Sequence, residues 1–267
     1  MVKDNLNTLY KALPSGVKLV AVSKFHPVER LMEAYNAGQR IFGENRPQEL
    51  AAKVPSMPDD VEWHFIGHLQ TNKLKLVLPY VSLVQSVDSL HLLEAINKWA
   101  VENGRIINIL LELHLGAEET KHGLTEDEIL SILRKEDGVS PENCGRPWPH
   151  EWEGPNGRLD GRQACLTDGK TDIGRDEDEV RRFSGLIPSS FPGVCIKGLM
   201  GMATNTDDMS VVEKDFERIE GLFKRLQAQH PQLTDLSIGM SGDWPLAVKH
   251  GATIVRIGTD IFGPREY

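Results

Sequence analysis

The chain has 267 residues, of which 40% are hydrophobic and 26% are charged, a composition typical of a globular protein with a buried core. Thirty basic and 39 acidic side chains give a net charge of −9, which disfavours nucleic acid as a partner because nucleic-acid binding needs clustered Lys and Arg. The first residues lack a signal-peptide pattern, and no stretch reaches the roughly 18 apolar residues of a membrane helix. The sequence therefore predicts a cytoplasmic protein that does not enter the membrane.

Short apolar runs rich in β-branched residues alternate along the chain with segments of helical periodicity. The predicted strands cover residues 17–22, 40–43, 62–67, 82–87, 106–115, 194–203, 233–240 and 253–258. The helix after the first strand is expected to end at Gly38, the helix after the fourth at Gly104, and Thr125 with Glu128 forms a capping box before another helix. Eight such units predict an α/β fold, a (β/α)8 barrel with its active site at the carboxyl ends of the strands. A doubly wound open sheet remains the alternative.

Residues 136–182 interrupt this alternation between the fifth and sixth strands. The segment is rich in Gly, Pro and acidic residues and has only five Val, Ile or Leu in 47 positions, so it cannot build a core of its own. We expect it to be a surface-loop insertion within one barrel domain that spans residues 1–267.

Polar residues follow nearly every predicted strand and would line the mouth of the barrel. They are Ser23, Lys24, His26, Glu44, Asn45, His64, His68, Gln70, Lys121, His122, Thr204, Ser241, Asp243, Arg256 and Thr259.

Lys24 is the most informative of these residues. A lysine directly after an apolar strand is partly desolvated, which lowers its pKa and allows it to form a Schiff base. Ser241-Gly242 and Gly258-Thr259 follow the seventh and eighth strands, where barrels commonly hold a phosphate. Taken singly, these segments also fit a solvent-facing lysine and two ordinary turns.

No spacing in the sequence predicts a metal site. His64 and His68 lie four residues apart but in a segment with strand character, so they do not share a helical face. His122 has no acidic partner in register, and the three cysteines show no CxxC spacing.

Six segments together resemble a known family: AVSKFHP, IFGENRPQEL, WHFIGHLQTNK, ETKHG, GLMGMA and MSGDWPLAVKHGATIVRIGTDIFG. In this order, they are similar to the YggS/PROSC family of pyridoxal 5′-phosphate (PLP) homeostasis proteins, which is related to the N-terminal barrel of alanine racemase. The similarity covers residues 6–135 and 185–265.

The resemblance implies a fold-type III PLP barrel in which Lys24 forms an aldimine with the cofactor. It also implies that Ser241, Gly258 and Thr259 contact the phosphate, that Arg256 faces the pyridine nitrogen, and that Asn45 and Met200 lie near the ring. Lys121 matches a family lysine proposed to assist cofactor transfer. Ser23, His64, Ser86 and Met202 are weaker matches.

An arginine beside the pyridine nitrogen opposes its protonation and makes the ring a weaker electron sink. The chain ends at GPREY, after the barrel, without the further β-domain of the racemase. We therefore expect a monomeric PLP carrier in intracellular PLP homeostasis, without strong catalytic activity, that supplies apo PLP-dependent enzymes. The alternatives are a PLP-dependent amino-acid racemase or lyase, and a phosphate-binding barrel without cofactor.

Overall fold

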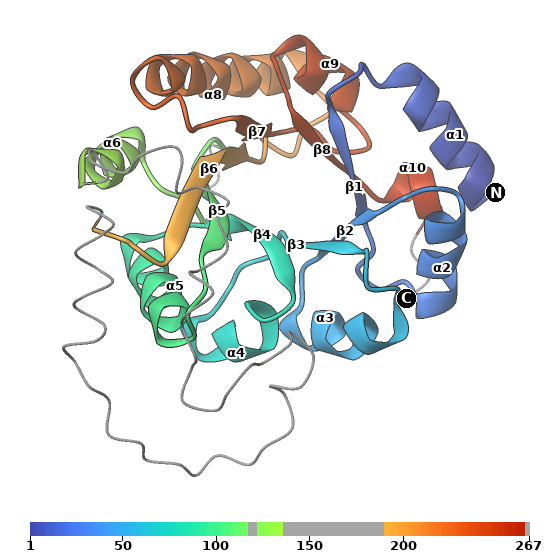
Figure 1. Cartoon of the computed structure of the whole chain (residues 1–267). Helices are drawn as coiled ribbons and strands as arrows, with labels where there is room; N and C mark the ends of the chain where they lie inside the picture. The colour runs from blue at the N-terminus through green and yellow to red at the C-terminus, as the bar shows by residue number, and fades with distance from the viewer. Residues whose placement is uncertain (117–121, 136–189, 265–267) are drawn as a thin grey trace, which may run out of the picture.

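The structure is a computed structural model that describes residues 1–116, 122–135 and 190–264. Its parallel strands pair in chain order, and the pairing of the first with the last closes a barrel (Figure 1). The prediction of a (β/α)8 barrel is confirmed, and the open sheet is excluded. The strands are β1 (Lys18–Val22), β2 (Ile41–Glu44), β3 (Glu62–Phe65), β4 (Val81–Val87), β5 (Ile107–Leu113), β6 (Val194–Gly201), β7 (Asp235–Ser237) and β8 (Ile254–Ile257).

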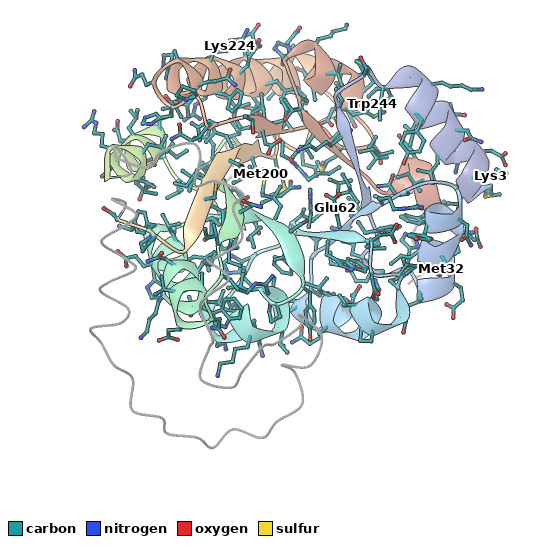
Figure 2. The ribbon with its side chains drawn as sticks, in the orientation of Figure 1. Lys3, Met32, Glu62, Met200, Lys224 and Trp244 are labelled. Carbon is teal, nitrogen blue, oxygen red and sulfur yellow. The ribbon has the colours of Figure 1, made fainter. Side chains whose placement is uncertain are left out.

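Helices surround the barrel on its outside (Figure 1). In the described residues they are α1 (Val2–Ala12), α2 (Val28–Asn36), α3 (Pro47–Lys53), α4 (Leu74–Val77), α5 (Leu90–Glu102), α6 (Glu126–Lys135), α8 (Met209–Gln229), α9 (Trp244–Lys249) and α10 (Thr259–Phe262), with 3-10 turns at Val54–Ser56 and Thr71–Lys73. In Figure 2, Lys3 and Lys224 lie on the outer helices, whereas Met200 lies on the barrel.

The local signals at the helix ends are confirmed. Gly38 and Gly104 follow the ends of α2 and α5 with φ angles of 105° and 58°, a conformation that favours glycine. The Thr125 N–H donates to Glu128 Oε2 (2.8 Å), and the Glu128 N–H donates to Thr125 Oγ1 (3.3 Å), which is the predicted capping box.

Two helical segments differ from the sequence expectation. The helix expected after the third strand is shorter, with a 3-10 turn and the four residues of α4, because Gln70 stays extended and Pro79 follows soon after. Gly258 and Thr259, which taken singly also fit an ordinary turn, begin the short helix α10.

The apolar core has two parts, one on each face of the barrel wall. A large cluster fills the space between the strands and the helices. A smaller one fills the inside of the barrel and consists of Val20, Leu83, Leu110, Met200 and Ile254.

Polar side chains lie above most of this inner cluster, toward the carboxyl ends of the strands, and Met200 pairs in register with Glu112 at their level. Gln85, Glu112 and Arg256 each follow an inner-cluster residue by two positions, and alternate residues of a strand point to the same face. The inside of the barrel is therefore apolar in the middle and polar toward the end where the site is expected.

The predicted insertion at residues 136–182 lies outside the described residues. It falls in the connection between β5 and β6, as expected, and the assignment of residues 1–267 to one domain stays a prediction. Among the described helices, none combines the length and the apolar character needed to cross a membrane.

Candidate functional site

Lys24 lies in a tight turn that follows β1. Its side chain is half-buried, and the preceding Ser23 is fully buried. The next residue, Phe25, has a φ angle of 67°. Among the described residues, it is the single non-glycine residue with a positive φ angle. Such a conformation costs about 1–3 kcal/mol and persists only where the surroundings impose it. The turn that presents Lys24 is therefore under constraint.

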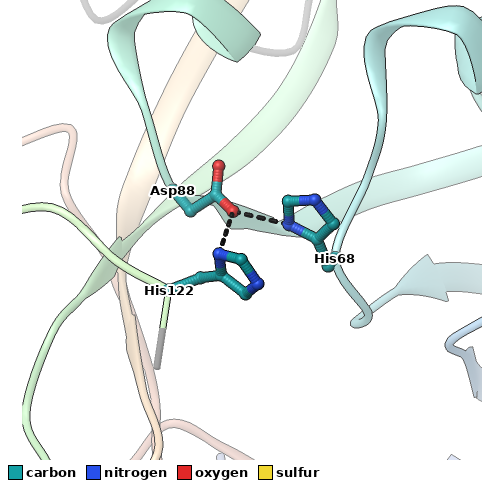
Figure 3. A group of neighbouring side chains, drawn as sticks. All are labelled: His68, Asp88 and His122. Carbon is teal, nitrogen blue, oxygen red and sulfur yellow. Dashed lines mark hydrogen bonds and ion pairs between the residues drawn. The ribbon is translucent and has the colours of Figure 1, made fainter. Parts of the chain in front are cut away.

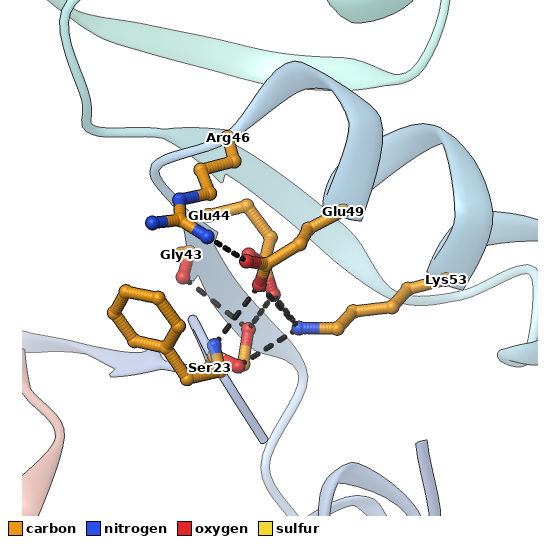
Figure 4. Close-up of polar contacts among 7 residues, drawn as sticks. Ser23, Gly43, Glu44, Arg46, Glu49 and Lys53 are labelled. Atoms are coloured by element: carbon orange, nitrogen blue, oxygen red, sulfur yellow. Dashed lines mark hydrogen bonds and ion pairs between the residues drawn. The ribbon is translucent and has the colours of Figure 1, made fainter. Parts of the chain in front are cut away.

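A buried ionic network from β2 and α3 supplies this constraint (Figure 4). Lys53 Nζ donates to the main-chain oxygen of Ser23 (2.9 Å) and to Glu44 Oε1 (2.7 Å). Ser23 Oγ donates to the same carboxylate oxygen (2.6 Å). The side chain of Glu44 is completely buried and that of Lys53 is 10% exposed, so this ion pair is shielded from solvent.

Glu49 holds the other side of the turn. Its Oε2 accepts from the Phe25 N–H (2.9 Å) and from Lys53 Nζ (3.2 Å), and the Arg46 guanidinium lies over the Phe25 ring. Burial acts to raise the pKa of Glu49, but the hydrogen bonds from Phe25 and Lys53 outweigh it and lower the pKa overall. In Glu44, burial prevails and raises the pKa.

Arg256 lies inside the barrel on β8. It donates to the main-chain oxygen of Ser237 (2.8 Å), to Ser237 Oγ (2.6 Å) and to the main-chain oxygen of Gly201 (2.9 Å). Burial lowers its pKa to about 10, so the guanidinium stays charged at neutral pH.

Hydrogen bonds continue from Arg256 across the barrel. Ser237 Oγ donates to Gln85 Oε1 (2.7 Å), and Gln85 Nε2 donates to His64 Nδ1 (2.8 Å). Burial and the charge of Lys18 lower the pKa of His64 to about 3, so this imidazole is neutral. The chain of contacts fixes the orientation of the guanidinium.

Glu112 on β5 is the other charged side chain of this polar layer. It is 4% exposed, and burial, with a contribution from Asp88, raises its pKa to about 7 although Arg256 acts in the opposite direction. This carboxyl group therefore changes its charge near physiological pH.

Asn45 lies beyond the end of β2, where it was expected. Its Oδ1 is buried and has no hydrogen-bond partner among the described residues. A Cβ atom on Gly67 would lie 2.3 Å from the main-chain oxygen of Asn45, so only glycine allows the ends of β2 and β3 to approach this closely. Asn45 is thus held in place with an unused acceptor.

The predicted phosphate contacts lie after the last two strands. Ser241 follows β7 and leads into α9, and Gly258 with Thr259 begins α10 after β8. The first N–H groups of a helix have no acceptor within it and are available to an anion. A Cβ atom on Gly258 would lie 3.3 Å from the Val22 main-chain oxygen, which places the start of α10 against the end of β1 and next to the Lys24 turn.

The remaining predicted residues have different settings. Met200 belongs to the apolar cluster inside the barrel, and Ser86 Oγ donates to the main-chain oxygen of Gly67 (2.5 Å). Met202 packs partly buried against the same inner cluster. Lys121 lies outside the described residues, so its role stays a prediction.

Sequence reasoning missed three features of this end of the barrel. Lys53 was not singled out in the segment PQELAAKV. Glu112 was not singled out in the apolar run IINILLELHL, where a charged residue at an inward position was the available signal. The statement that His122 lacks an acidic partner was wrong: its Nδ1 lies 3.9 Å from Asp88 Oδ2 (Figure 3). The two residues are 34 positions apart in the sequence and follow different strands. Their contact depends on how the side chains are oriented, which the sequence pattern does not give.

Comparisons with known proteins agree with this architecture. Residues 1–143 match the family model described as alanine racemase, N-terminal domain. A pyridoxal phosphate homeostasis protein of Vibrio alginolyticus is 31% identical over 95% of this chain and 89% of its own length.

Solved structures show the same similarity. PipY of Synechococcus elongatus PCC7942 with PLP bound is 32% identical, with a TM-score of 0.72 over 98% of this chain and 100% of that one. Alanine racemase from E. faecalis is 16% identical, with a TM-score of 0.61, and the match covers 98% of this chain and 57% of the racemase. This last similarity concerns the fold alone.

Proposed function

The chain belongs to the family of pyridoxal phosphate homeostasis proteins, and from this premise we propose that it binds PLP at the carboxyl end of its barrel. Lys24 is the residue that carries the cofactor. The observation on which the proposal depends most is the constrained turn after β1, in which a half-buried lysine is followed by a residue with a φ angle of 67°.

The residues around this turn fit the chemical groups of PLP. The cofactor has an aldehyde, a phosphate, a ring nitrogen and a ring hydroxyl. Lys24 supplies an amine, the start of α10 supplies N–H donors for an anion, and Arg256 supplies a fixed positive charge. Asn45 adds a buried Oδ1 without a partner. An unsatisfied buried polar atom costs about 1–3 kcal/mol, which a hydrogen-bonding ligand would recover.

Each residue has a distinct part in holding the cofactor. Lys24 makes the covalent attachment, and Ser241, Gly258 and Thr259 bind the phosphate. Asn45 and Met200 position the ring. When bound, PLP supplies an electrophilic aldehyde carbon and a ring that can accept electrons. The network of Glu44, Glu49 and Lys53 acts on the cofactor only indirectly, through the turn that it holds.

Arg256 favours a carrier over a strong catalyst. Its guanidinium is charged, and its hydrogen bonds to Ser237 and Gly201 fix its orientation. A fixed positive charge at the ring nitrogen opposes protonation there, so electron withdrawal by the ring is weaker than with a carboxylate partner. We therefore propose that the chain stores PLP, delivers it to apo PLP-dependent enzymes and contributes to PLP homeostasis in the cytoplasm.

Absorption spectroscopy of the PLP-loaded protein tests the site. Wild-type protein should show the visible band of lysine-bound PLP, and Lys24→Ala should lose it. Lys98→Ala, which removes an exposed lysine on α5, is the matched control and should keep the band. An unchanged band in Lys24→Ala would exclude Lys24 as the attachment point.

Solvent deuterium exchange distinguishes a carrier from a racemase or lyase. A racemase must exchange the Cα proton of its amino acid with solvent, whereas a carrier need not. The PLP-loaded protein should incorporate no more deuterium into candidate amino acids than free PLP does. It should restore activity to an apo PLP-dependent enzyme when the two are mixed. Fast exchange would instead support the racemase alternative.

A further inference from the structure

Three side chains meet at the mouth of the barrel on the side away from Lys24. His68, Asp88 and His122 follow β3, β4 and β5, which are consecutive in the barrel wall. Figure 3 shows both imidazoles turned toward one carboxylate oxygen. His68 Nδ1 lies 2.8 Å and His122 Nδ1 lies 3.9 Å from Asp88 Oδ2.

We propose that His68, Asp88 and His122 form a binding site for a divalent first-row transition-metal ion, with Zn²⁺ as the best match. One candidate ligand atom from each residue lies within 4.8 Å of the other two. Two imidazoles and a carboxylate suit zinc, and three protein ligands leave a coordination position for water or another ligand. This proposal does not depend on PLP binding.

The distances from Asp88 to the two histidines are close to those of a metal site, and His122 has to turn out of its stack on His68 for both rings to face one ion. Ligand atoms lie about 2.0–2.2 Å from a zinc ion, so the atoms of neighbouring ligands approach one another to about 3–3.5 Å. The contact of His68 with Asp88 is slightly shorter than this and that of His122 slightly longer. The side chain of His122 is 61% exposed, so little packing opposes its rotation.

Among the described residues, the polar contact of His122 within this cluster is the long one to Asp88. Its Nδ1 is beyond hydrogen-bond distance of Asp88, and its ring stacks on that of His68 with centroids 4.2 Å apart and planes at 18°. A cation held between the three side chains would give His122 Nδ1 a closer partner than Asp88 does.

Asp88 is the most buried of the three proposed metal ligands. Its side chain is 7% exposed, whereas those of His68 and His122 are 45% and 61% exposed. The buried carboxylate would therefore be the ligand with the least freedom to move, whereas the two imidazoles face solvent. An ion bound here would have its free coordination position at the mouth of the barrel, open to water or to a small anion.

Metal titration of the full chain tests the proposal. The protein, freed of any histidine tag and dialysed against a chelator, is titrated with Zn²⁺ by calorimetry, and bound metal is counted by elemental analysis. Wild-type protein should bind one Zn²⁺ at this site. His68→Ala, Asp88→Asn and His122→Ala each alter a direct ligand and should weaken binding by about 100-fold or more, since even the loss of a partner that only orients a ligand costs about 10- to 100-fold.

Control variants and a spectroscopic probe complete the test. His91→Ala removes an exposed histidine on α5 and should bind Zn²⁺ as the wild type does. Co²⁺ in place of Zn²⁺ should give visible absorption bands that His68→Ala and His122→Ala abolish, with thermal melts showing that these variants stay folded. Absence of saturable binding in the wild type, or equal binding by the wild type and both histidine variants, would overturn the proposal.

Discussion

The two sides of the barrel mouth hold their charged groups in opposite ways. Beside β1, Glu44 of β2 and Lys53 of α3 are buried, in contact at 2.7 Å, and joined to Ser23 by further hydrogen bonds. At β3 to β5, His68 and His122 are exposed around a single carboxylate. The first arrangement holds a turn in a strained conformation, and the second leaves donor atoms accessible. We infer that the first side positions a side chain and that the second offers its donor atoms to a ligand.

Breaking the buried ion pair should have the largest effect. In Lys53→Met, the Glu44 carboxylate loses its counter-charge, and removing one partner of a buried pair costs about 3–5 kcal/mol. Urea denaturation should show this loss in the free energy of unfolding. PLP affinity should fall as well, because the main-chain oxygen of Ser23 loses its donor and the Lys24 turn loosens.

A double variant separates charge from packing at this position. Glu44→Gln with Lys53→Met removes both charges, and replacing a whole buried pair is often nearly neutral. The double variant should therefore recover part of the lost stability. If Lys53→Met alone changed stability by less than about 1 kcal/mol, the range of an exposed pair, the buried network would not hold the turn.

The next largest effect is a pH-dependent change in stability that comes from Glu112. Its pKa is about 7 in the folded protein against an ordinary value near 4.5, so the fold binds its proton more tightly than the unfolded chain does. The stabilisation of the fold by this protonated carboxyl group is fully present below the ordinary pKa and is lost as pH rises through 7. The free energy of unfolding falls by about 3 kcal/mol in total. Glu112→Gln keeps a neutral side chain and should not show this loss.

Unfolding measured from pH 4 to pH 8.5 in both proteins checks this expectation. The stability difference between Glu112→Gln and wild type should grow with pH and reach a plateau above pH 7. Glu62→Gln, which alters an exposed residue at the start of β3, is the control and should follow the wild type. A difference that does not change with pH would contradict the proposed ionisation.

The smallest effect should come from the other side of the mouth. Without metal, His68→Ala and His122→Ala remove exposed side chains, and such surface changes stay within about 0.5 kcal/mol. Excess Zn²⁺ should raise the melting temperature of the wild type but not of these variants, because a ligand that binds only the folded state stabilises it. A marked loss of stability in the metal-free variants would show that the cluster has a structural role instead.

The sequence predicted most of the fold because the barrel depends on local signals. Strands such as β1 and β8 are compact apolar runs, and Gly38, Gly104 and the Thr125 capping box mark helix ends. Lys24 and Arg256 were also visible, since each is a charged residue at or near the end of an apolar run.

The other site features depend on side-chain geometry that no local pattern carries. Lys53 lies on a helix of ordinary composition, and only the packing of α3 against β1 and β2 brings it to Glu44 and Ser23. Asp88 and His122 belong to separate strand ends, so barrel closure predicts that these ends are neighbours but not that the side chains face one another. The φ angle of Phe25 likewise follows from tertiary contacts.

Chemical trapping identifies the lysine that carries PLP. Borohydride reduction of the PLP-loaded protein makes a covalent link between PLP and its lysine permanent, and peptide mass spectrometry then locates it. We expect one modified peptide that contains Lys24, with the modification absent from Lys24→Ala and present in Lys98→Ala. A modification at another lysine, or one that persists at the same level in Lys24→Ala, would exclude Lys24 as the residue that binds PLP.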